Sequence, residues 1–384
     1  NGSGALSFAT VGAALYAAET TGSTDPTASG TLSLAIGSAA SATGLRSVAV
    51  GRAATATAQD SVAIGTDADT GSATGSVAIK GDISGPSSNA SVSILGATTK
   101  PGVVQIGMNG YVQANNAVAI GYDADVESSG TAGVAIGATA HVNGAYAVAL
   151  GNSRANGAAS FAAVIENNTS SYGATGANSI AMGRQAKARD TRAISIGYFT
   201  DVNGYGGVAI GSNCYVNQGY GVAMGNYART HARYGAFIYA NGYLVDAGDA
   251  QTGIMVLRKA TTDATPSAIT STGGAASSTT QLVLTNESAI TFTGTVVCRE
   301  DATDGDDYAG WEIKGVIMRQ GQASDTTLGV GIVNSLYHTA GLANASVALS
   351  ADTTNGALQV EATGIAATNL HWVATLNFSE VKNF

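Results

Sequence analysis

Five acidic side chains in one short segment are the first candidates for chemistry in this chain. The segment "EDATDGDDYAG" sets them around a glycine, at Glu300, Asp301, Asp304, Asp306 and Asp307. Clustered carboxylates on a tight turn supply the oxygen ligands that Ca²⁺ prefers. The spacing differs from that of an EF-hand, and an acidic, solvated hairpin loop would explain the same residues. Both interpretations stay open.

The remaining reactive side chains are sparse and scattered. The four histidines, His141, His231, His338 and His371, form no pattern with metal-ligand spacing. A glycoside hydrolase needs a pair of carboxylates across the scissile bond, and no segment marks such a pair. We therefore expect no catalytic residue, no metal site and no cofactor, and we do not expect an enzyme.

The two cysteines, Cys214 and Cys298, lie in regions of different composition. They are expected to be unpaired and do not define a disulfide framework. Cys214 occupies a position that other parts of the chain fill with Ala or Thr, so it is interpreted as a small core residue.

Tyrosine is concentrated in one part of the chain. Eight of the fifteen fall in a short stretch: Tyr198, Tyr205, Tyr215, Tyr220, Tyr227, Tyr234, Tyr239 and Tyr243. Tyr146, Tyr220 and Tyr234 are predicted to share one repeat position, five residues before the unit's last residue. Exposed tyrosines can stack on sugars or anchor an interface. A ladder of rings that steadies neighbouring repeats is the alternative.

Composition limits the class of protein. Of 384 residues, 45% are hydrophobic and 11% charged, which is too apolar for a disordered chain. The 51 glycines lack the three-residue period of collagen. A net charge of −9 with scattered basic residues disfavours nucleic acid as a partner. No run approaches the roughly 20 apolar residues of a membrane-spanning helix.

The elements that position these residues repeat along the chain. A V-A-I-G phrase recurs, and it ends at Gly37, Gly51, Gly65, Gly107, Gly121, Gly137, Gly151, Gly183, Gly197, Gly211 and Gly225. Seven of the intervals between neighbouring glycines in this series are 14 residues long. Degenerate copies are predicted to end at Lys80, Gly96, Ile165 and Tyr239. The array therefore runs over 31–240. Longer intervals follow Gly65, Gly121 and Gly151, and are either drift or loops on a binding face.

Each unit has a second half with small residues three and five positions after the glycine, such as Ala140 and Val142. Residues at i and i+2 share one face of a strand, so a unit holds two short strands with small side chains inward. Val142-Asn143-Gly144 is expected to supply a positive-φ turn, and His141 should point outward. Fourteen residues thus form one coil of a narrow β-solenoid, too thin for large side chains.

The pattern V-A-I-G-x-x-A-x-A-x-G at this period resembles the head repeat of YadA-type trimeric adhesins. The resemblance implies a left-handed parallel β-roll in which three chains pack side by side. Physical reasoning supports a homotrimer independently. The V-A-I strands carry more apolar positions than one narrow interior can hold, and the surplus would be buried against neighbouring chains.

Near Ala240 the period stops and longer amphipathic strands begin. The predicted strands are Gly253–Arg258, Gln281–Thr285, Ile290–Arg299, Trp311–Arg319, Leu328–Ile332, Ser346–Leu349, Leu358–Val360 and Leu370–Phe378. In the last, alternation places Leu370, Trp372, Ala374, Leu376 and Phe378 on one buried face. Eight strands joined by Gly, Asp and Ser loops predict an antiparallel β-sandwich or jelly roll.

The segments "GDAQ…VLRKATTDATP", "TFTGTVVCRE…WEIKGVIMRQ" and "HWVATLNFSEV" resemble a domain at the C-terminal end of bacteriophage tail fibres and tail-spike-like proteins. No heptads and no neck motif are present, although both are typical of YadA-type adhesins. The expected organisation is an N-terminal connecting or capping segment over 1–30, the repeat rod over 31–240 and a receptor-binding tip over 241–384.

These features predict a structural and receptor-binding tail fibre on the virion tail, outside the cell. Its expected partners are two further copies of the chain, a host-surface glycan or outer-membrane receptor, and an upstream fibre or baseplate protein. Recognition usually resides in loops on a rigid scaffold. We therefore predict that five residues in loops of the tip contact the receptor: Asp304, Asp306, Tyr308, Tyr337 and His338. The alternatives are the extracellular part of a trimeric autotransporter adhesin and a polysaccharide-degrading tail spike.

Overall fold

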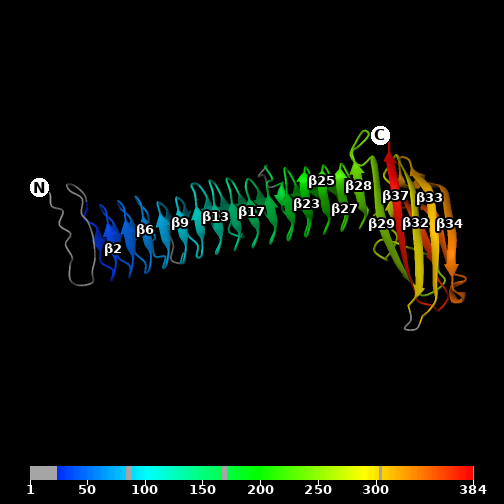
Figure 1. The fold of residues 1–384 in the computed structure, drawn as a ribbon, viewed down its shortest axis with the longest axis horizontal. Coiled ribbons are helices and arrows are strands. Elements are labelled where there is room, and N and C mark those ends of the chain that lie inside the picture. The colour runs from blue at the N-terminus through cyan, green and yellow to red at the C-terminus, as the bar shows by residue number, and fades with distance from the viewer. Residues whose placement is uncertain (1–23, 84–88, 167–170, 302–304, 384) are drawn as a thin grey trace. The chain divides into compact units, whose positions relative to one another are not determined.

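The computed structural model describes residues 24–83, 89–166, 171–301 and 305–383. Within them the protein is all-β, with two short 3₁₀ turns and no α-helix. About 15 turns of β-solenoid precede a set of longer strands (Figure 1). No helix in the described part has the length and apolar character to cross a bilayer. The chain divides into two compact units, residues 1–185 and 186–384, which are described separately.

The first unit is a stack of coils, each contributing one V-A-I strand to a parallel sheet. Val48 pairs with Val62, and Ala49 with Ala63, so the repeat period sets the register. Each of these strands is three residues long: β2 (Leu34–Ile36), β4 (Val48–Val50), β6 (Val62–Ile64), β7 (Val77–Ile79), β9 (Val92–Ile94), β11 (Val104–Ile106), β13 (Val118–Ile120), β15 (Val134–Ile136), β17 (Val148–Leu150), β19 (Phe161–Ala163) and β21 (Ile180–Met182).

The second half of most coils forms a two-residue strand that pairs in parallel with its neighbours, opposite the V-A-I sheet. In one coil it is reduced to isolated bridges from Asp69 to Thr55 and Asp82. In the described part of the chain the first strand begins at Thr27, which pairs with Ser41 of the next coil. These strands are β1 (Thr27–Ala28), β3 (Ser41–Ala42), β5 (Thr55–Ala56), β8 (Asp82–Ile83), β10 (Ala97–Thr98), β12 (Tyr111–Val112), β14 (Asp125–Val126), β16 (His141–Val142), β18 (Arg154–Ala155) and β20 (Gly173–Ala174).

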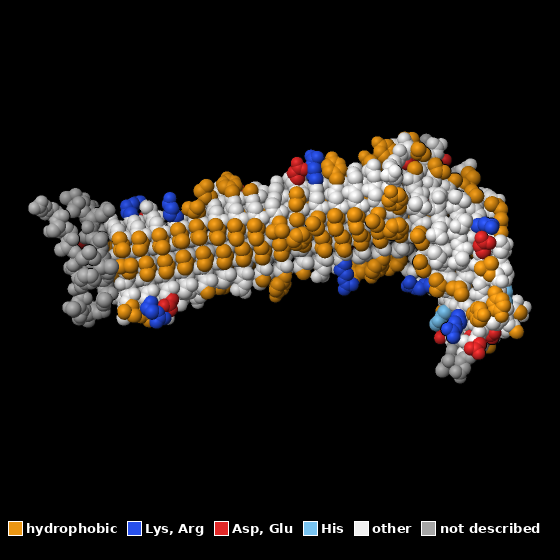
Figure 2. All heavy atoms as spheres, in the orientation of Figure 1, with side chains coloured by type: hydrophobic (Ala, Val, Ile, Leu, Met, Phe, Trp, Pro, Cys, Tyr) orange, Lys and Arg blue, Asp and Glu red, His pale blue; other side chains and the backbone are white. Residues whose placement is uncertain are grey.

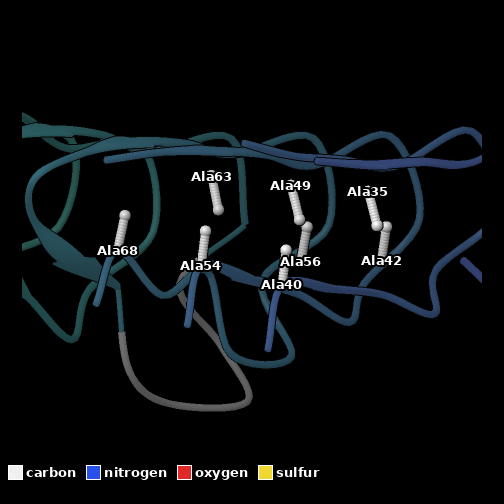
Figure 3. Packing of buried hydrophobic residues seen from close by; sticks show 8 residues of the cluster. All are labelled: Ala35, Ala40, Ala42, Ala49, Ala54, Ala56, Ala63 and Ala68. Carbon is white, nitrogen blue, oxygen red and sulfur yellow. The ribbon is translucent and has the colours of Figure 1, made fainter. Parts of the chain in front are cut away.

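Alanine fills the space between the two sheets. Figure 3 shows the side chains of Ala35 and Ala49 on one sheet pointing toward Ala42 and Ala56 on the other. All four are 0% exposed. The predicted inward positions are therefore confirmed, and the interior is too thin to accept a ring.

The glycines of the coil have a different role from the one predicted at Val142-Asn143-Gly144. The positive φ of that turn belongs to Tyr146, at 58°, rather than to Asn143 or Gly144. A Cβ on Gly144 would lie 2.0 Å from the carbonyl oxygen of Gly157 in the next coil. Glycine is required there because coils stack backbone against backbone.

The degenerate coils keep the strand register, and the copy predicted to end at Lys80 does so, because Ile64 pairs with Ile79. The other copies have a different last residue from the one predicted. Val92 pairs with Val77 and Ile94 with Ile79, which puts Leu95 rather than Gly96 at the turn position. By the same pairing the coil of β19 reaches this position at Val164, not Ile165. Strand pairing tolerates these substitutions because it depends on backbone groups.

Two columns of apolar side chains run along the outer side of the V-A-I sheet. In each strand the central residue is buried, while the flanking Val and Ile face away from the coil interior. Figure 2 shows them as continuous parallel lines. Ile64 and Ile136 are each 39% exposed. The surplus of apolar positions expected from the sequence is present.

The second unit begins with further coils of the same kind. Their strands are β22 (Lys187–Ala188), β23 (Ile194–Tyr198), β24 (Asp201–Val202), β25 (Val208–Ser212), β26 (Tyr215–Val216), β27 (Val222–Asn226) and β28 (Phe237–Asn241). Val222 pairs with Phe237 and Met224 with Tyr239, so the last turn position is Ala240 rather than the predicted Tyr239. Gly225 and Ala240 are thereby in register.

An antiparallel sheet continues directly from the last coil. Strand β28 pairs with β29 through Phe237 and Ile254. The order is then β29, β37, β32, β33 and β34, with the C-terminal strand in an inner position. Its strands are β29 (Ala250–Thr261), β32 (Ser288–Glu300), β33 (Tyr308–Arg319), β34 (Thr327–His338) and β37 (Leu370–Lys382).

A smaller sheet is built around β36. Strand β35 pairs along one edge of it, and β30 and β31 pair along the other. The strands are β30 (Ser267–Ala268), β31 (Leu282–Val283), β35 (Ser346–Asp352) and β36 (Ala357–Thr363). All eight predicted strands are present, most of them longer than expected, and β30 was missed because it has only two residues. The predicted buried face of β37 is confirmed, with Leu370 and Ala374 both 0% exposed.

Candidate receptor-binding surface

The register of the five-stranded sheet brings three of the five predicted contact residues, Tyr308, Tyr337 and His338, to one end of it. Arg299, near the end of β32, pairs with Tyr308 at the start of β33 and with His371 at the start of β37. Ala309 pairs with His338 at the end of β34. Residues far apart in sequence therefore meet at the rim of the sheet, where the loops emerge.

Tyr308 and Tyr337 form an exposed aromatic pair at this rim. Their rings are stacked, with centroids 5.3 Å apart and planes 28° apart. The two side chains are 50% and 54% exposed. The hydroxyl of Thr339 donates to the carbonyl oxygen of Tyr308 and accepts from its N–H, which fixes the backbone beneath the first ring. Such a pair offers a rigid flat surface with polar edges.

His338 lies on the opposite face of the sheet from the tyrosine pair. Its backbone partner Ala309 is buried, whereas Tyr337 pairs with Gly310 on the other face. The imidazole packs against the edge of Trp311 at 5.0 Å and lies 2.9 Å from the hydroxyl of Ser335. Alternation along a strand makes this separation unavoidable, so His338 does not extend the surface of Tyr308 and Tyr337.

The acidic residues of the loop before β33 point in different directions. Asp306 is exposed next to Tyr308. Asp307 is oriented toward Gly341, where an added Cβ would meet its carboxylate, and its carbonyl accepts from Glu300. Asp304 lies outside the described residues. Among the residues described, no group of three or more His, Cys, Asp or Glu could hold a metal, and calcium binding by this loop stays an open prediction.

A recess beside the rim adds basic residues that the sequence did not single out. It has a volume of about 430 Å³ and is lined by Arg258 and Lys259 of β29, by the 272–273 loop, and by His371 of β37. Asp301 lies 3.5 Å from the His371 imidazole. In the sequence, the only sign of this recess is the basic dipeptide Arg258-Lys259 within an amphipathic strand. The 272–273 loop and β37 come to lie beside that dipeptide only in the fold.

The tyrosines of the coils form an edge-to-face ladder within one chain. Tyr205 and Tyr220 have ring centroids 5.5 Å apart, and Tyr220 and Tyr234 are 5.6 Å apart. The guanidinium of Arg192 lies over Tyr205. The register aligns Tyr220 with Gly235, so Tyr234 does not share its slot as predicted. The ladder interpretation fits these three rings, although Tyr220 remains 51% exposed.

Both cysteines are free and buried. The thiol of Cys214 is directed at carbonyl oxygens of its own and the next coil, and burial raises its pKa. Burial also raises the pKa of Cys298, to about 11. The expectation of unpaired cysteines, and of Cys214 as a core residue, is confirmed.

His141 points out of its coil as predicted but is largely covered by its neighbours. Its side chain is 13% exposed and lies between Asp125, at 3.9 Å, and Glu127, at 3.5 Å. Burial and the positive charge of Arg154 lower its pKa. The repeat register brings these groups into one column on the outer side of the second sheet.

Four segments of the chain match the YadA head domain repeat (2 copies), at residues 28–54, 42–68, 128–153 and 174–200. The chain contains YadA head repeats. These segments lie in the coils described above, and the repeat predicted from the sequence is thereby confirmed. No curated protein matches the chain by sequence.

Two solved structures are similar to this chain in part. The first is a tailspike protein gp49 from Acinetobacter baumannii bacteriophage Fri1, a capsular polysaccharide depolymerase, with 9% identity, 90% of this chain and 67% of that chain covered, and a TM-score of 0.26. The second is an Acinetobacter baumannii phage AM24 tailspike protein, with 8% identity, 95% and 58% coverage, and a TM-score of 0.19. Likeness at these TM-scores carries no argument about activity.

Proposed function

We propose that the chain is the distal part of a homotrimeric tail fibre of a bacteriophage or phage-like particle, and that it attaches the particle to the host surface. In this proposal the coils are a stiff spacer, three chains pack through the apolar columns of the V-A-I sheet, and the strands after Asn241 form a β-sandwich tip. Three identical tips close to one axis bind with avidity, so each single contact can be weak.

The observation that carries the proposal is the exposed pair Tyr308 and Tyr337. Exposed aromatic rings held in a fixed geometry are typical anchors of recognition surfaces. The nearby recess adds Arg258 and His371, whose side chains can donate hydrogen bonds to sugar hydroxyl or carboxylate groups. The rim therefore combines stacking surface and polar groups, which suits a host-surface glycan.

A test compares the full chain with the double variant Tyr308→Ala/Tyr337→Ala on an array of bacterial surface glycans. We expect the double variant to lose binding by about thirtyfold or more, since truncation of even one hot-spot aromatic typically costs at least about 2 kcal/mol. Tyr122→Ala is the matched control, because Tyr122 is 54% exposed but lies on a coil. Equal binding by all three proteins would refute the assignment to the rim.

Point variants are preferable to separating the coils from the tip. A cut between residues 245 and 246 would divide Arg229 from Gln251, whose backbone and side chain hydrogen-bond to each other. It would also separate the buried side chains of Arg233 and Glu380. A fragment that failed to bind would then report lost folding rather than a lost site.

The YadA head repeats favour a second candidate, the extracellular part of a bacterial trimeric adhesin. Immunogold labelling of purified virions and of bacterial cell surfaces separates the two, since the fibre proposal requires the label on virion tails. A third candidate, a polysaccharide-degrading spike, requires release of new reducing ends from capsular polysaccharide. We expect none, because no segment of the sequence marks the pair of carboxylates that glycoside hydrolysis needs.

A further inference from the structure

A second hollow lies in the Tyr-rich coils, away from the rim of the tip. Its volume is about 390 Å³, within the range of about 300–1,000 Å³ typical of small-molecule sites. Its walls combine aromatic rings with charged and amide groups, chiefly Phe199, Asp201, Asn213, Tyr215, Tyr227 and Arg229. All of these residues belong to the second unit.

The 14-residue period builds this hollow from two adjacent columns. Asp201, Tyr215 and Arg229 are successive register partners on the outer side of the second sheet. Phe199 and Tyr227 lie two residues before Asp201 and Arg229, in the turn between the two strands of a coil, where their φ angles are 52° and 64°. Register partners in a parallel sheet are about 4.8 Å apart, so neighbouring columns place three coils within reach of one ligand.

The aromatic residues at this turn distinguish these coils from the others. A positive φ at the same position, two residues before the short strand, recurs in the first unit without an aromatic side chain: Ala39, Ala53, Asp67, Lys80, Leu95, Asn109, Asp123, Thr139 and Gln185. The turn conformation is thus a property of the coil, whereas the rings are specific to this place. Phe199 packs edge-on against Tyr198 at 4.4 Å, and Tyr227 against Tyr243 at 4.5 Å. The walls are therefore held in position.

The loop after β28 closes one end of the hollow with Asp246 and Ala247. The carboxylate of Asp249 accepts hydrogen bonds from the N–H groups of Leu244, Val245 and Asp246, at 2.9, 2.6 and 2.9 Å. These three bonds fix the loop, and the Asp246 carboxylate accepts a further hydrogen bond from the N–H of Ala247 at 2.7 Å. A rigid wall lowers the ordering cost that a ligand must offset.

The polar groups of the hollow are not fully satisfied within the chain. Oδ2 of Asp201 accepts from Arg189 at 2.6 Å, but Oδ1 of Asp201 and Nε of Arg229 are buried with no hydrogen-bond partner among the described residues. Burial raises the pKa of Asp201, with Arg189 opposing. An acceptor and a donor that both lack partners suit a ligand whose groups donate and accept. Arg229 also lies over the Tyr215 ring, at 5.5 Å.

We propose that this hollow is a binding site for a neutral saccharide unit, distinct from the rim of the tip. Sugar hydroxyls donate and accept hydrogen bonds, and the C–H face of a pyranose stacks on aromatic rings. An anionic ligand would meet Asp201 and Asp246, and a cationic ligand would meet Arg229. The site lies on the opposite sheet from the apolar columns, so packing of three chains through those columns leaves it accessible.

The proposal goes beyond attachment through the tip and has a separate test. Saturation-transfer difference NMR is recorded on the full chain with methyl glycosides of glucose, galactose, mannose and N-acetylglucosamine. We expect transfer to the ring protons of at least one glycoside. Tyr215→Ala and Asp201→Asn should weaken its binding about tenfold, because a hydrogen bond to a charged group and a stacked ring each contribute on that order.

Matched controls occupy the same strand position elsewhere in the coils. Tyr111 and Asp125, like Tyr215 and Asp201, are the first residues of two-residue strands on the second sheet and point outward. Tyr111→Ala and Asp125→Asn should leave the transfer unchanged, and thermal unfolding curves check that all four variants fold. The proposal is overturned if no glycoside shows transfer, or if variants and controls lose it equally. Loss with Tyr308→Ala/Tyr337→Ala alone would place the sugar at the tip instead.

Discussion

Arg233 and Glu380, 147 residues apart in the sequence, form a fully buried bidentate ion pair. Nη1 of the guanidinium donates to Oε2 at 2.7 Å, and Nη2 donates to Oε1 at 2.5 Å. Arg233 lies in the final coil, four residues after the bridge between Tyr215 and Arg229. Glu380 lies near the end of β37. The pair therefore joins the final coil to the tip through side chains as well as through the β28–β29 ladder.

The remaining polar atoms of this pair are also bonded. Nε of Arg233 donates to the carbonyl of Val283, and the Gln251 amide donates to Glu380 at 2.8 Å. The guanidinium lies over the Phe378 ring. Burial raises the pKa of Glu380, but the charge and hydrogen bonds of Arg233 outweigh it, so the net pKa is below the ordinary value. The carboxylate is ionised in the fold at neutral pH.

Removing one partner should destabilise the junction strongly. Arg233→Met leaves a buried carboxylate without its cation, and the expected loss in the free energy of unfolding is about 3–5 kcal/mol. Chemical denaturation followed by tryptophan fluorescence measures it, since Trp311 and Trp372 are both in the tip.

The double variant Arg233→Met/Glu380→Leu is the control for this prediction. It removes both charges together and should recover much of the loss, because hydrophobic replacement of a buried pair is often neutral. A single variant as stable as the parent chain would show that the pair does not stabilise the junction.

The coils were largely predictable because one short pattern fixes them. The period of 14 residues, the Ala of each V-A-I phrase and the small residues that follow leave one arrangement in which all face inward. The predictions failed where backbone geometry decides and composition does not. Gly144 was assigned to a turn, but it is needed for the close approach of the next coil.

The candidate sites were predictable only in part. Tyr308 and Tyr337 were selected from the loop pattern, and strand pairing does bring them together. The same pairing places His338 on the other face, because adjacent residues of a strand point to opposite faces. This was missed because the predicted strand Leu328–Ile332 ended before Tyr337 and His338, which belong to β34. Arg233 and Glu380 were not paired, since a contact across 147 residues leaves no local signal.

The narrow interior makes a specific prediction for Ala209. This residue is 0% exposed and lies between the two sheets. Ala209→Phe should reduce the free energy of unfolding by at least about 1–3 kcal/mol, because a packed core accommodates added volume only by strain. Hydrogen exchange of the flanking coils should rise. Ala97→Phe is the control, since Ala97 is exposed on a coil strand, and equal effects would argue against a packed interior at Ala209.

The proposed trimer depends on the apolar columns of the V-A-I sheet. Ile120 belongs to one column and is half-buried in a single chain. Sedimentation of the parent chain should give three times the mass of one chain, and Ile120→Glu should shift it toward monomer, because a charge buried at an interface is strongly unfavourable. Ala97→Glu, on the other sheet, should leave the trimer intact. A folded monomer of the parent chain at low micromolar concentration contradicts the proposal.

His231 should make the junction sensitive to mild acid. Its ring is half-buried, and its Nε2 lies 2.9 Å from the carbonyl oxygen of Gly248, to which it donates. Burial is the main cause that lowers its pKa. Arg233 and Lys382 act in the same direction, while Glu380 and the bond to Gly248 oppose it. The neutral ring is therefore the form that the fold accepts.

The sign of the effect follows from this depressed pKa. The unfolded chain takes up the proton near the ordinary histidine pKa of about 6.5, while the folded chain does so only at lower pH. The contribution to stability is thus complete above about pH 6.5 and decreases as pH falls toward the folded pKa. Hydrogen exchange of residues 242–251 should rise between pH 7 and pH 5.5 in the parent chain. His231→Gln, which can still donate to Gly248, should flatten this dependence, and His371→Gln, an exposed histidine, should not. A parent chain whose exchange, corrected for the intrinsic pH effect, stays constant over that range would show that His231 is not held neutral.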